Sequence, residues 1–226
     1  MLVLSIDTAL KGCAAALWRD GETVARIVEP MDKGQAERLA PLVAQLLADA
    51  GISPPQLDRI AVTTGPGAFT GLRVGLAFAR SFGLALDRPV LGFPTLEVLA
   101  AGAAAERCVA AVAMAGSLFA AAYEGRRCVL APGRIADPAA VVARLGPGWS
   151  VTGPGAASLA GLASDWTLIP QELPEPLVLA GLAAFAEPDA HPASPLYLRG
   201  ADAKLPGGII PPEADSGAGA LPELLA

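Results

Sequence analysis

A glycine-rich segment between an apolar stretch and a long helical pattern limits the folds open to this chain. It reads Thr63-Thr64-Gly65-Pro66-Gly67-Ala68-Phe69-Thr70-Gly71-Leu72-Arg73-Val74-Gly75. The apolar residues before it predict a buried strand over 60–63, and the pattern after it predicts a helix over 70–86. Glycine adopts backbone angles that other residues avoid, so the segment predicts a tightly shaped turn from strand to helix.

Small residues recur at every fourth position of this predicted helix, so they lie along one of its faces. The stripe consists of Gly71, Gly75, Ala79 and Gly83. A glycine inside a helix costs about 1 kcal/mol relative to alanine, which indicates that another backbone approaches this face closely. We expect a partner helix to pack against the stripe.

The glycine turn itself allows two interpretations. Backbone amides at a helix N-terminus after a glycine loop can bind phosphate, but the segment lacks the Gly-Lys-Ser/Thr ending of a P-loop. Alternatively, the glycines only turn the chain and let the helix pack tightly. The sequence favours the second interpretation.

Composition places the chain among globular proteins. Of its 226 residues, 53% are hydrophobic and only 17% are charged, and the net charge is −6. Binding nucleic acid directly needs clustered lysines and arginines, so we expect RNA to be held by a partner if it is involved. The apolar runs are broken at Asp7 and at Glu106-Arg107, which predicts a cytoplasmic protein without a membrane segment. The three cysteines, Cys13, Cys108 and Cys128, are expected in the core.

The predicted strands and helices occur in the order β-β-β-α-β-α twice, although no sequence repeat accompanies this order. Such a duplicated βββαβα order predicts an α/β protein of the actin, Hsp70 and sugar-kinase (ASKHA) fold, in which nucleotide lies between two small subdomains. We place the subdomains at 1–104 and 105–199. A flexible, acidic tail is expected over 200–226.

Asp7 and Thr8 begin a short polar turn directly after the first predicted strand. The turn either presents a carboxylate to a nucleotide-bound metal, which would make Asp7 and Thr8 nucleotide-binding residues, or Asp7 and Thr8 satisfy the amides of their own turn. The whole chain contains one histidine, His191, in a predicted loop. Because neither a Ser-His-Asp set nor a two-histidine metal motif can be assembled, we assign no catalytic residue and no metal site.

Four segments together resemble the TsaB family, also called YeaZ, and follow its order over residues 2–199. They are Ile6-Asp7-Thr8-Ala9, Ala36-Glu37-Arg38-Leu39-Ala40-Pro41, Gly65-Pro66-Gly67-Ala68-Phe69-Thr70-Gly71-Leu72-Arg73-Val74-Gly75 and Pro195-Leu196-Tyr197-Leu198-Arg199. The chain departs from the family at Gln35, where histidine is usual, and at Ala113-Met114-Ala115, where Asp-Ala-Arg is usual. These departures put in doubt any binding role of those polar positions.

The resemblance implies a bacterial, non-catalytic subunit in the formation of N6-threonylcarbamoyladenosine at position 37 of tRNAs that read ANN codons. It implies binding to a TsaD-type transferase through helices 35–50 and 70–86, and a TsaE-type ATPase that joins the pair. It also implies a homodimer through the same helices when the chain is alone, tRNA contact only through the complex, and no cofactor of its own apart from ATP or ADP at the complex interface.

On these two helices we expect the following contact residues: Leu39, Leu42, Val43, Leu46, Gly71, Arg73, Gly75, Ala79 and Gly83. Arg73 and Arg80, seven residues apart, either hold a partner carboxylate or only solvate the helix. The rival hypothesis is an active ATP-dependent phosphotransferase or ATPase of the same fold with Asp7 as the carboxylate that binds its metal. A peptidase is a third and weaker hypothesis.

Overall fold

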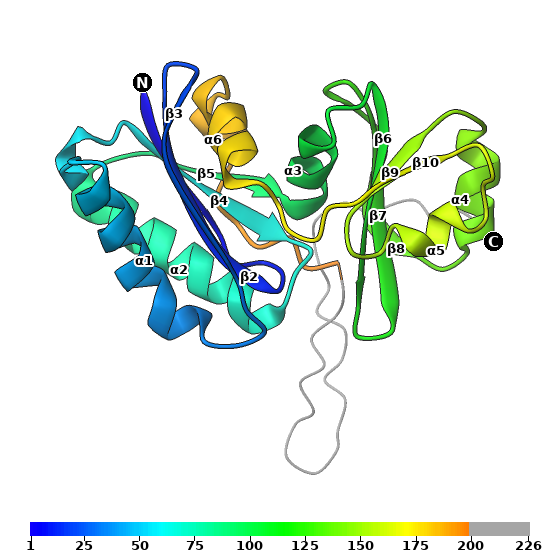
Figure 1. The fold of residues 1–226 in the computed structure, drawn as a ribbon, viewed down its shortest axis with the longest axis horizontal. Helices are drawn as coiled ribbons and strands as arrows, with labels where there is room; N and C mark the ends of the chain where they lie inside the picture. The colour runs from blue at the N-terminus through cyan, green and yellow to red at the C-terminus, as the bar shows by residue number, and fades with distance from the viewer. Residues whose placement is uncertain (199–226) are drawn as a thin grey trace, which may run out of the picture.

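The computed structural model describes residues 1–198, which form two lobes, each built on a five-stranded sheet (Figure 1). The tail expected over 200–226 lies outside the described residues. No helix within residues 1–198 is both long and apolar enough to cross a membrane.

The first sheet has the strand order β3-β2-β1-β4-β5. Its strands are β1 (Leu2–Asp7), β2 (Gly12–Arg19), β3 (Glu22–Pro30), β4 (Arg59–Gly65) and β5 (Val90–Pro94). β1 runs antiparallel to β2 and parallel to β4, and every residue of β1 is buried. Strands that are covered on both faces need continuous apolar runs, and β1 and β4 have such runs. Helices α1 (Gln35–Asp49) and α2 (Phe69–Leu86) lie side by side on one face of this sheet (Figure 1).

The second sheet repeats this arrangement with the order β10-β9-β6-β7-β8. Its strands are β6 (Arg107–Met114), β7 (Ser117–Glu124), β8 (Arg127–Ile135), β9 (Ser150–Thr152) and β10 (Thr167–Ile169). The shorter helices are α3 (Thr95–Gly102), α4 (Pro138–Leu145), α5 (Ala157–Ala160), η1 (Pro54–Gln56) and η2 (Pro188–Ala190). In both sheets the first strand of the meander is central and the third lies at an edge, which confirms the duplicated α/β fold.

The boundary predicted between the subdomains is wrong for the last part of the chain. Helix α6 (Pro176–Ala184) packs on the first sheet, on the face opposite α1 and α2 (Figure 1). Leu179 and Ala180 share a core there with Val3 of β1 and Ala61 of β4. The second lobe therefore ends before α6, and the first lobe is completed by residues from both ends of the described chain.

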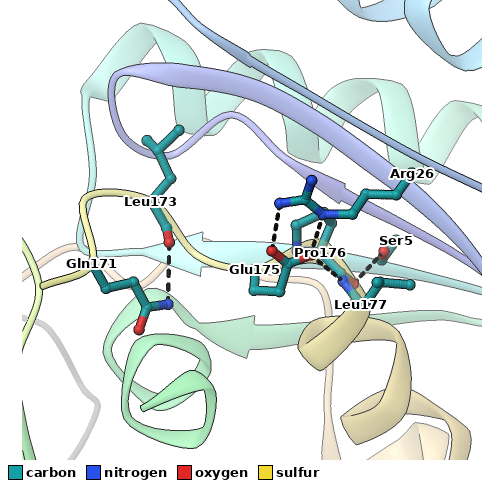
Figure 2. A network of polar contacts seen from close by, with 7 residues as sticks. All are labelled: Ser5, Arg26, Gln171, Leu173, Glu175, Pro176 and Leu177. Atoms are coloured by element: carbon teal, nitrogen blue, oxygen red, sulfur yellow. Dashed lines mark hydrogen bonds and ion pairs between the residues drawn. The ribbon is translucent and has the colours of Figure 1, made fainter. Parts of the chain in front are cut away.

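Polar contacts fix the return of the chain to the first lobe (Figure 2). Arg26 of β3 donates two hydrogen bonds, of 2.7 and 2.6 Å, to the carboxylate of Glu175, which also caps α6. The Ser5 hydroxyl donates to the Pro176 carbonyl at 2.6 Å. The two residues of each of these hydrogen bonds are 149 and 171 positions apart in the chain. A local sequence pattern carries no information about such distant partners, so the correct boundary could not be predicted from the sequence.

After α6, residues 191–198 form an extended strap along the first lobe. The amide of Gly92 in β5 donates to the His191 carbonyl at 2.9 Å, and the Leu196 amide donates to the Thr64 carbonyl at 2.8 Å. Arg80 of α2 donates through Nε to the Ala193 carbonyl at 2.7 Å. These contacts hold the strap against β4, β5 and α2.

The two lobes share an apolar core. Leu10 and Leu72 of the first lobe pack with Leu96 and Leu99 of α3 and with Tyr123 of the second sheet.

The expected core position of the cysteines is confirmed for Cys13 and Cys108 but is wrong for Cys128, which is exposed.

Candidate partner interface

The glycines between β4 and α2 make room for the chain's own first turn. A Cβ atom on Gly67 would collide with the Ala9 carbonyl, and one on Gly71 would collide with the Thr8 carbonyl. At Gly75 it would lie 2.5 Å from the Thr8 hydroxyl oxygen. The segment therefore wraps around residues 8 and 9, and this close packing supports the second of the two interpretations of the turn.

The small-residue stripe of α2 faces the first sheet and does not form the predicted partner contact. Gly71, Gly75, Ala79 and Gly83 are all buried. A Cβ atom on Gly83 would overlap the Val90 side chain of β5. The close approach inferred from the glycines is present, but the approaching groups belong to β4, β5 and the turn after β1. The assignment of this stripe to a partner helix is wrong.

The same correction applies to the apolar residues of α1. Leu39, Leu42, Val43 and Leu46 are buried in the core of the first lobe, against β1 and β2. An amphipathic helix on a sheet buries its apolar stripe, so these four residues hold α1 in place. None of them is available to a partner in this structure.

The exposed residues of α1 and α2 include a set of small, uncharged side chains, which we call the outer face; Glu37, Gln45 and Asp49 of α1 and Arg73 and Arg80 of α2 are also exposed. The members of the outer face are Ala40, Pro41, Ala44 and Ala48 of α1 with Ala77, Ser81, Leu84 and Ala85 of α2. Leu84 has 85% of its side chain exposed and is the one large apolar residue of this surface. On α1, Arg38 points the other way, toward β3, where it donates two hydrogen bonds to Glu29. Because most of these side chains are short, the backbone of another helix could approach the outer face closely.

Arg73 is the one predicted contact residue that lies on the surface. Its guanidinium carbon lies 3.6 Å from the centre of the Phe69 ring, and its Nε donates to the Tyr197 hydroxyl at 3.4 Å. The other arginine of α2, Arg80, holds the strap. Of the two roles left open for this pair, holding a partner carboxylate fits only Arg73.

Asp7 and Thr8, the candidate nucleotide-binding residues, are buried at the end of β1. The Asp7 carboxylate accepts from the Thr63 hydroxyl at 2.6 Å and from the Ala9 amide at 3.2 Å. The Thr8 hydroxyl donates to the Gly71 carbonyl at 2.7 Å. Burial raises the pKa of Asp7 to about 6, although the two hydrogen bonds act in the opposite direction. Asp7 bonds to its own turn and to β4, and Thr8 bonds to α2, so both side chains are engaged inside the chain and this geometry gives no support to a nucleotide-binding role for them.

The departure Ala113-Met114-Ala115 lies at the turn between β6 and β7. With Ser117 and Ser158 these residues line an open hollow of about 390 Å³ that carries no charged side chain. A phosphate group there would meet hydroxyls and backbone but no cation. This geometry gives no support to anion binding at the turn.

Groups for catalysis are sparse in the described part of the chain. No cluster of three or more histidine, cysteine, aspartate or glutamate residues within 1–198 is arranged to hold a metal. His191 lies in a loop as predicted but is half-buried, because its ring stacks on Phe93 with centroids 4.5 Å apart. The imidazole thus serves packing between the strap and β5.

The sequence pattern does not distinguish the exposed alanines of the outer face from other alanines. It also does not indicate that Phe69 and Tyr197 are 51% and 49% exposed. The available signal was the leucine stripe of α1 itself, since an apolar stripe at helical spacing is usually core and leaves the opposite face of the helix exposed.

Two lobes with the same strand order, a shared core and helices on both faces of the first sheet define a protein of the actin and sugar-kinase fold. A family model described as "TsaD: tRNA N6-adenosine threonylcarbamoyltransferase" matches residues 28–184. The structure of YeaZ from Pseudomonas aeruginosa is similar, with a TM-score of 0.72 and 29% identity, covering 87% of this chain and 99% of that one. The chain belongs to the TsaB (YeaZ) family.

Relatives by sequence agree with this assignment. The tRNA threonylcarbamoyladenosine biosynthesis protein TsaB of Escherichia coli is 36% identical over 129 residues. That match covers 55% of each protein, so the chain spans about half the length of this relative. An uncharacterized protein of Mycobacterium bovis is also 36% identical, over 89% of this chain and 93% of that protein.

Proposed function

We propose that this chain is a non-catalytic subunit in the formation of N6-threonylcarbamoyladenosine at position 37 of tRNAs that read ANN codons. In this role it binds and activates a TsaD-type transferase. The family assignment supports the pathway, since a relative is named for tRNA threonylcarbamoyladenosine biosynthesis. The buried, internally bonded state of Asp7 supports a subunit without its own catalysis.

The outer face of α1 and α2 is the observation that carries the proposal. Its side chains are small and uncharged, and its one large apolar residue, Leu84, is almost fully exposed. Small residues let two helix pairs approach closely, and the buried centre of a protein interface is poor in charged residues. A helix pair of a partner packed on this face would shield Leu84 from water.

The remaining parts of the proposal follow from the family. A TsaE-type ATPase joins the pair, and ATP or ADP binds at the interface of the complex, not in this chain alone. Two copies associate through the same outer face when the transferase is absent. The complex acts in the cytoplasm. This chain contacts tRNA only through the complex, because a chain with a net charge of −6 has little attraction for phosphates.

Substitution of Leu84 by arginine tests the proposal. A charged side chain at the centre of an apolar contact must be desolvated, so Leu84→Arg is expected to weaken binding to the transferase by roughly 10–100-fold. The matched control is Leu162→Arg, because Leu162 is also exposed but lies in the second lobe. Binding is measured by titration calorimetry, and stimulation of threonylcarbamoyl transfer to tRNA is measured in the reconstituted system.

Equal binding by both variants and the unchanged chain would contradict the proposal. ATP hydrolysis by the purified chain alone, abolished in Asp7→Asn, would favour the rival ATPase instead. Melting temperatures of both variants should match the unchanged chain, because neither leucine contributes to the buried core.

A further inference from the structure

Two exposed aromatic rings lie next to an arginine at the N-terminal end of α2. The Phe69 and Tyr197 rings have centroids 6.0 Å apart, and about half of each side chain is exposed. Arg73 joins them, with its guanidinium carbon over the Phe69 ring and its Nε bonded to the Tyr197 hydroxyl. We call these three residues the aromatic cluster.

The aromatic cluster is held in place before any ligand arrives. Phe69 and Arg73 are one turn apart on α2, so the helix sets their spacing. Tyr197 is brought to them by the strap, which the Leu196 amide and the Arg80 side chain fix to the first lobe. A fixed side chain loses little conformational freedom on binding, which favours its use as an anchor.

The Phe69 and Tyr197 rings do not contribute to the apolar core of the first lobe. Neither Phe69 nor Tyr197 belongs to any of the apolar core clusters among the described residues. No acidic side chain within residues 1–198 forms an ion pair with Arg73. Phenylalanine, tyrosine and arginine grouped in this way are typical of the residues that dominate binding energy in protein interfaces.

We infer that the aromatic cluster is an energetic centre of the contact with the transferase, at the edge of the outer face. The two rings would enter an apolar pocket of the partner, and Arg73 would bind a carboxylate at the rim of that pocket. The cluster is continuous with the outer face because Arg73 and Ala77 are exposed one turn apart on α2. The inference rests on the proposed function, whose partner it shares.

A protein surface fits the cluster better than single-stranded RNA. RNA bases also stack on aromatic rings, but such sites follow the backbone with a positively charged groove. Here the other arginine of α2, Arg80, is engaged by the strap, and the whole chain is acidic. The unpaired charge of Arg73 alone matches one carboxylate and not a run of phosphates.

Three single variants, Phe69→Ala, Arg73→Ala and Tyr197→Ala, test the inference in the full chain. Each is expected to weaken binding to the purified transferase by roughly 10–100-fold, the range for central aromatic and arginine residues of interfaces. Tyr197→Phe keeps the ring and should retain most of the binding. The control is Phe185→Ala, which removes an aromatic side chain that is 75% exposed after α6 and should leave binding unchanged.

Melting temperatures show whether each variant is folded at the temperature of the titration. Cluster variants that bind as tightly as the unchanged chain, while Leu84→Arg is weakened, would overturn this inference and leave the proposed function intact. If Leu84→Arg also binds normally, both fail. Binding of a single-stranded RNA oligomer by the chain alone, lost in Phe69→Ala, would assign the cluster to RNA and overturn the inference.

Discussion

Replacing Gly71 with alanine is expected to lower the melting temperature by roughly 6–12 °C. The new Cβ atom would collide with the Thr8 carbonyl oxygen, which is backbone and cannot rotate away as a side chain would. Overpacking of this kind costs about 3 kcal/mol when the neighbour is rigid, and 1 kcal/mol shifts the melting temperature of a domain of this size by about 2–4 °C. Differential scanning calorimetry measures the shift.

Gly181→Ala in α6 is the matched control. Gly181 is also inside a helix, but a Cβ atom there would have no neighbouring atom within 4 Å. Alanine is the better helix former, so this variant should be as stable as the unchanged chain or more stable by about 0.5–1 kcal/mol. Helix propensity alone would make both variants more stable, so a Gly71→Ala variant as stable as Gly181→Ala would show that the Thr8 carbonyl does not limit the space at Gly71.

The contrast between these two glycines shows what the sequence could predict. Glycines at every fourth position of α2 indicated a close approach, and the structure has one. The spacing carries no information about which group approaches, and the neighbour at Gly71 is a carbonyl 63 residues earlier in the chain. Contact with a partner and contact with the chain's own sheet therefore gave the same sequence pattern.

The order of strands and helices was predictable because each element has its own local pattern. Continuous apolar runs marked β1 and β4, and the leucine spacing marked α1. Two such sets in the same order were enough to predict the duplicated fold. The return of α6 to the first lobe was not predictable, because α6 is apolar on all sides and its pattern does not favour one sheet over the other.

The sequence did not allow the exposed residues of α1 and α2 to be told from the buried ones. The residues chosen on α1 were its apolar stripe, and a helix that covers a sheet uses that stripe for its own core. An exposed alanine leaves no mark in a single sequence. Phe69 and Tyr197 were visible in the sequence, but only the fold brings these residues together across 128 positions.

Asp7 is expected to make the fold less stable as the pH rises from about 4 to about 6. Burial raises its pKa from an ordinary value of 3.8 to about 6 in the folded chain. Between these two values the folded chain holds a proton that the unfolded chain has released, so the free energy of unfolding falls as the pH increases. Above pH 6 the full loss, roughly 2–3 kcal/mol, remains in place.

Urea unfolding of the unchanged chain and of Asp7→Asn, from pH 4 to pH 8, measures this loss. Asparagine has nearly the same shape, and its side-chain oxygen can still accept from the Thr63 hydroxyl and the Ala9 amide. Other groups also titrate, since burial raises the pKa of Glu97 and Arg38 lowers that of Glu29. These contributions are common to both proteins, so the difference between the two curves isolates Asp7. The unchanged chain should lose stability relative to the variant as the pH increases, whereas parallel curves would show that the Asp7 carboxylate has an ordinary pKa and is not sealed from water.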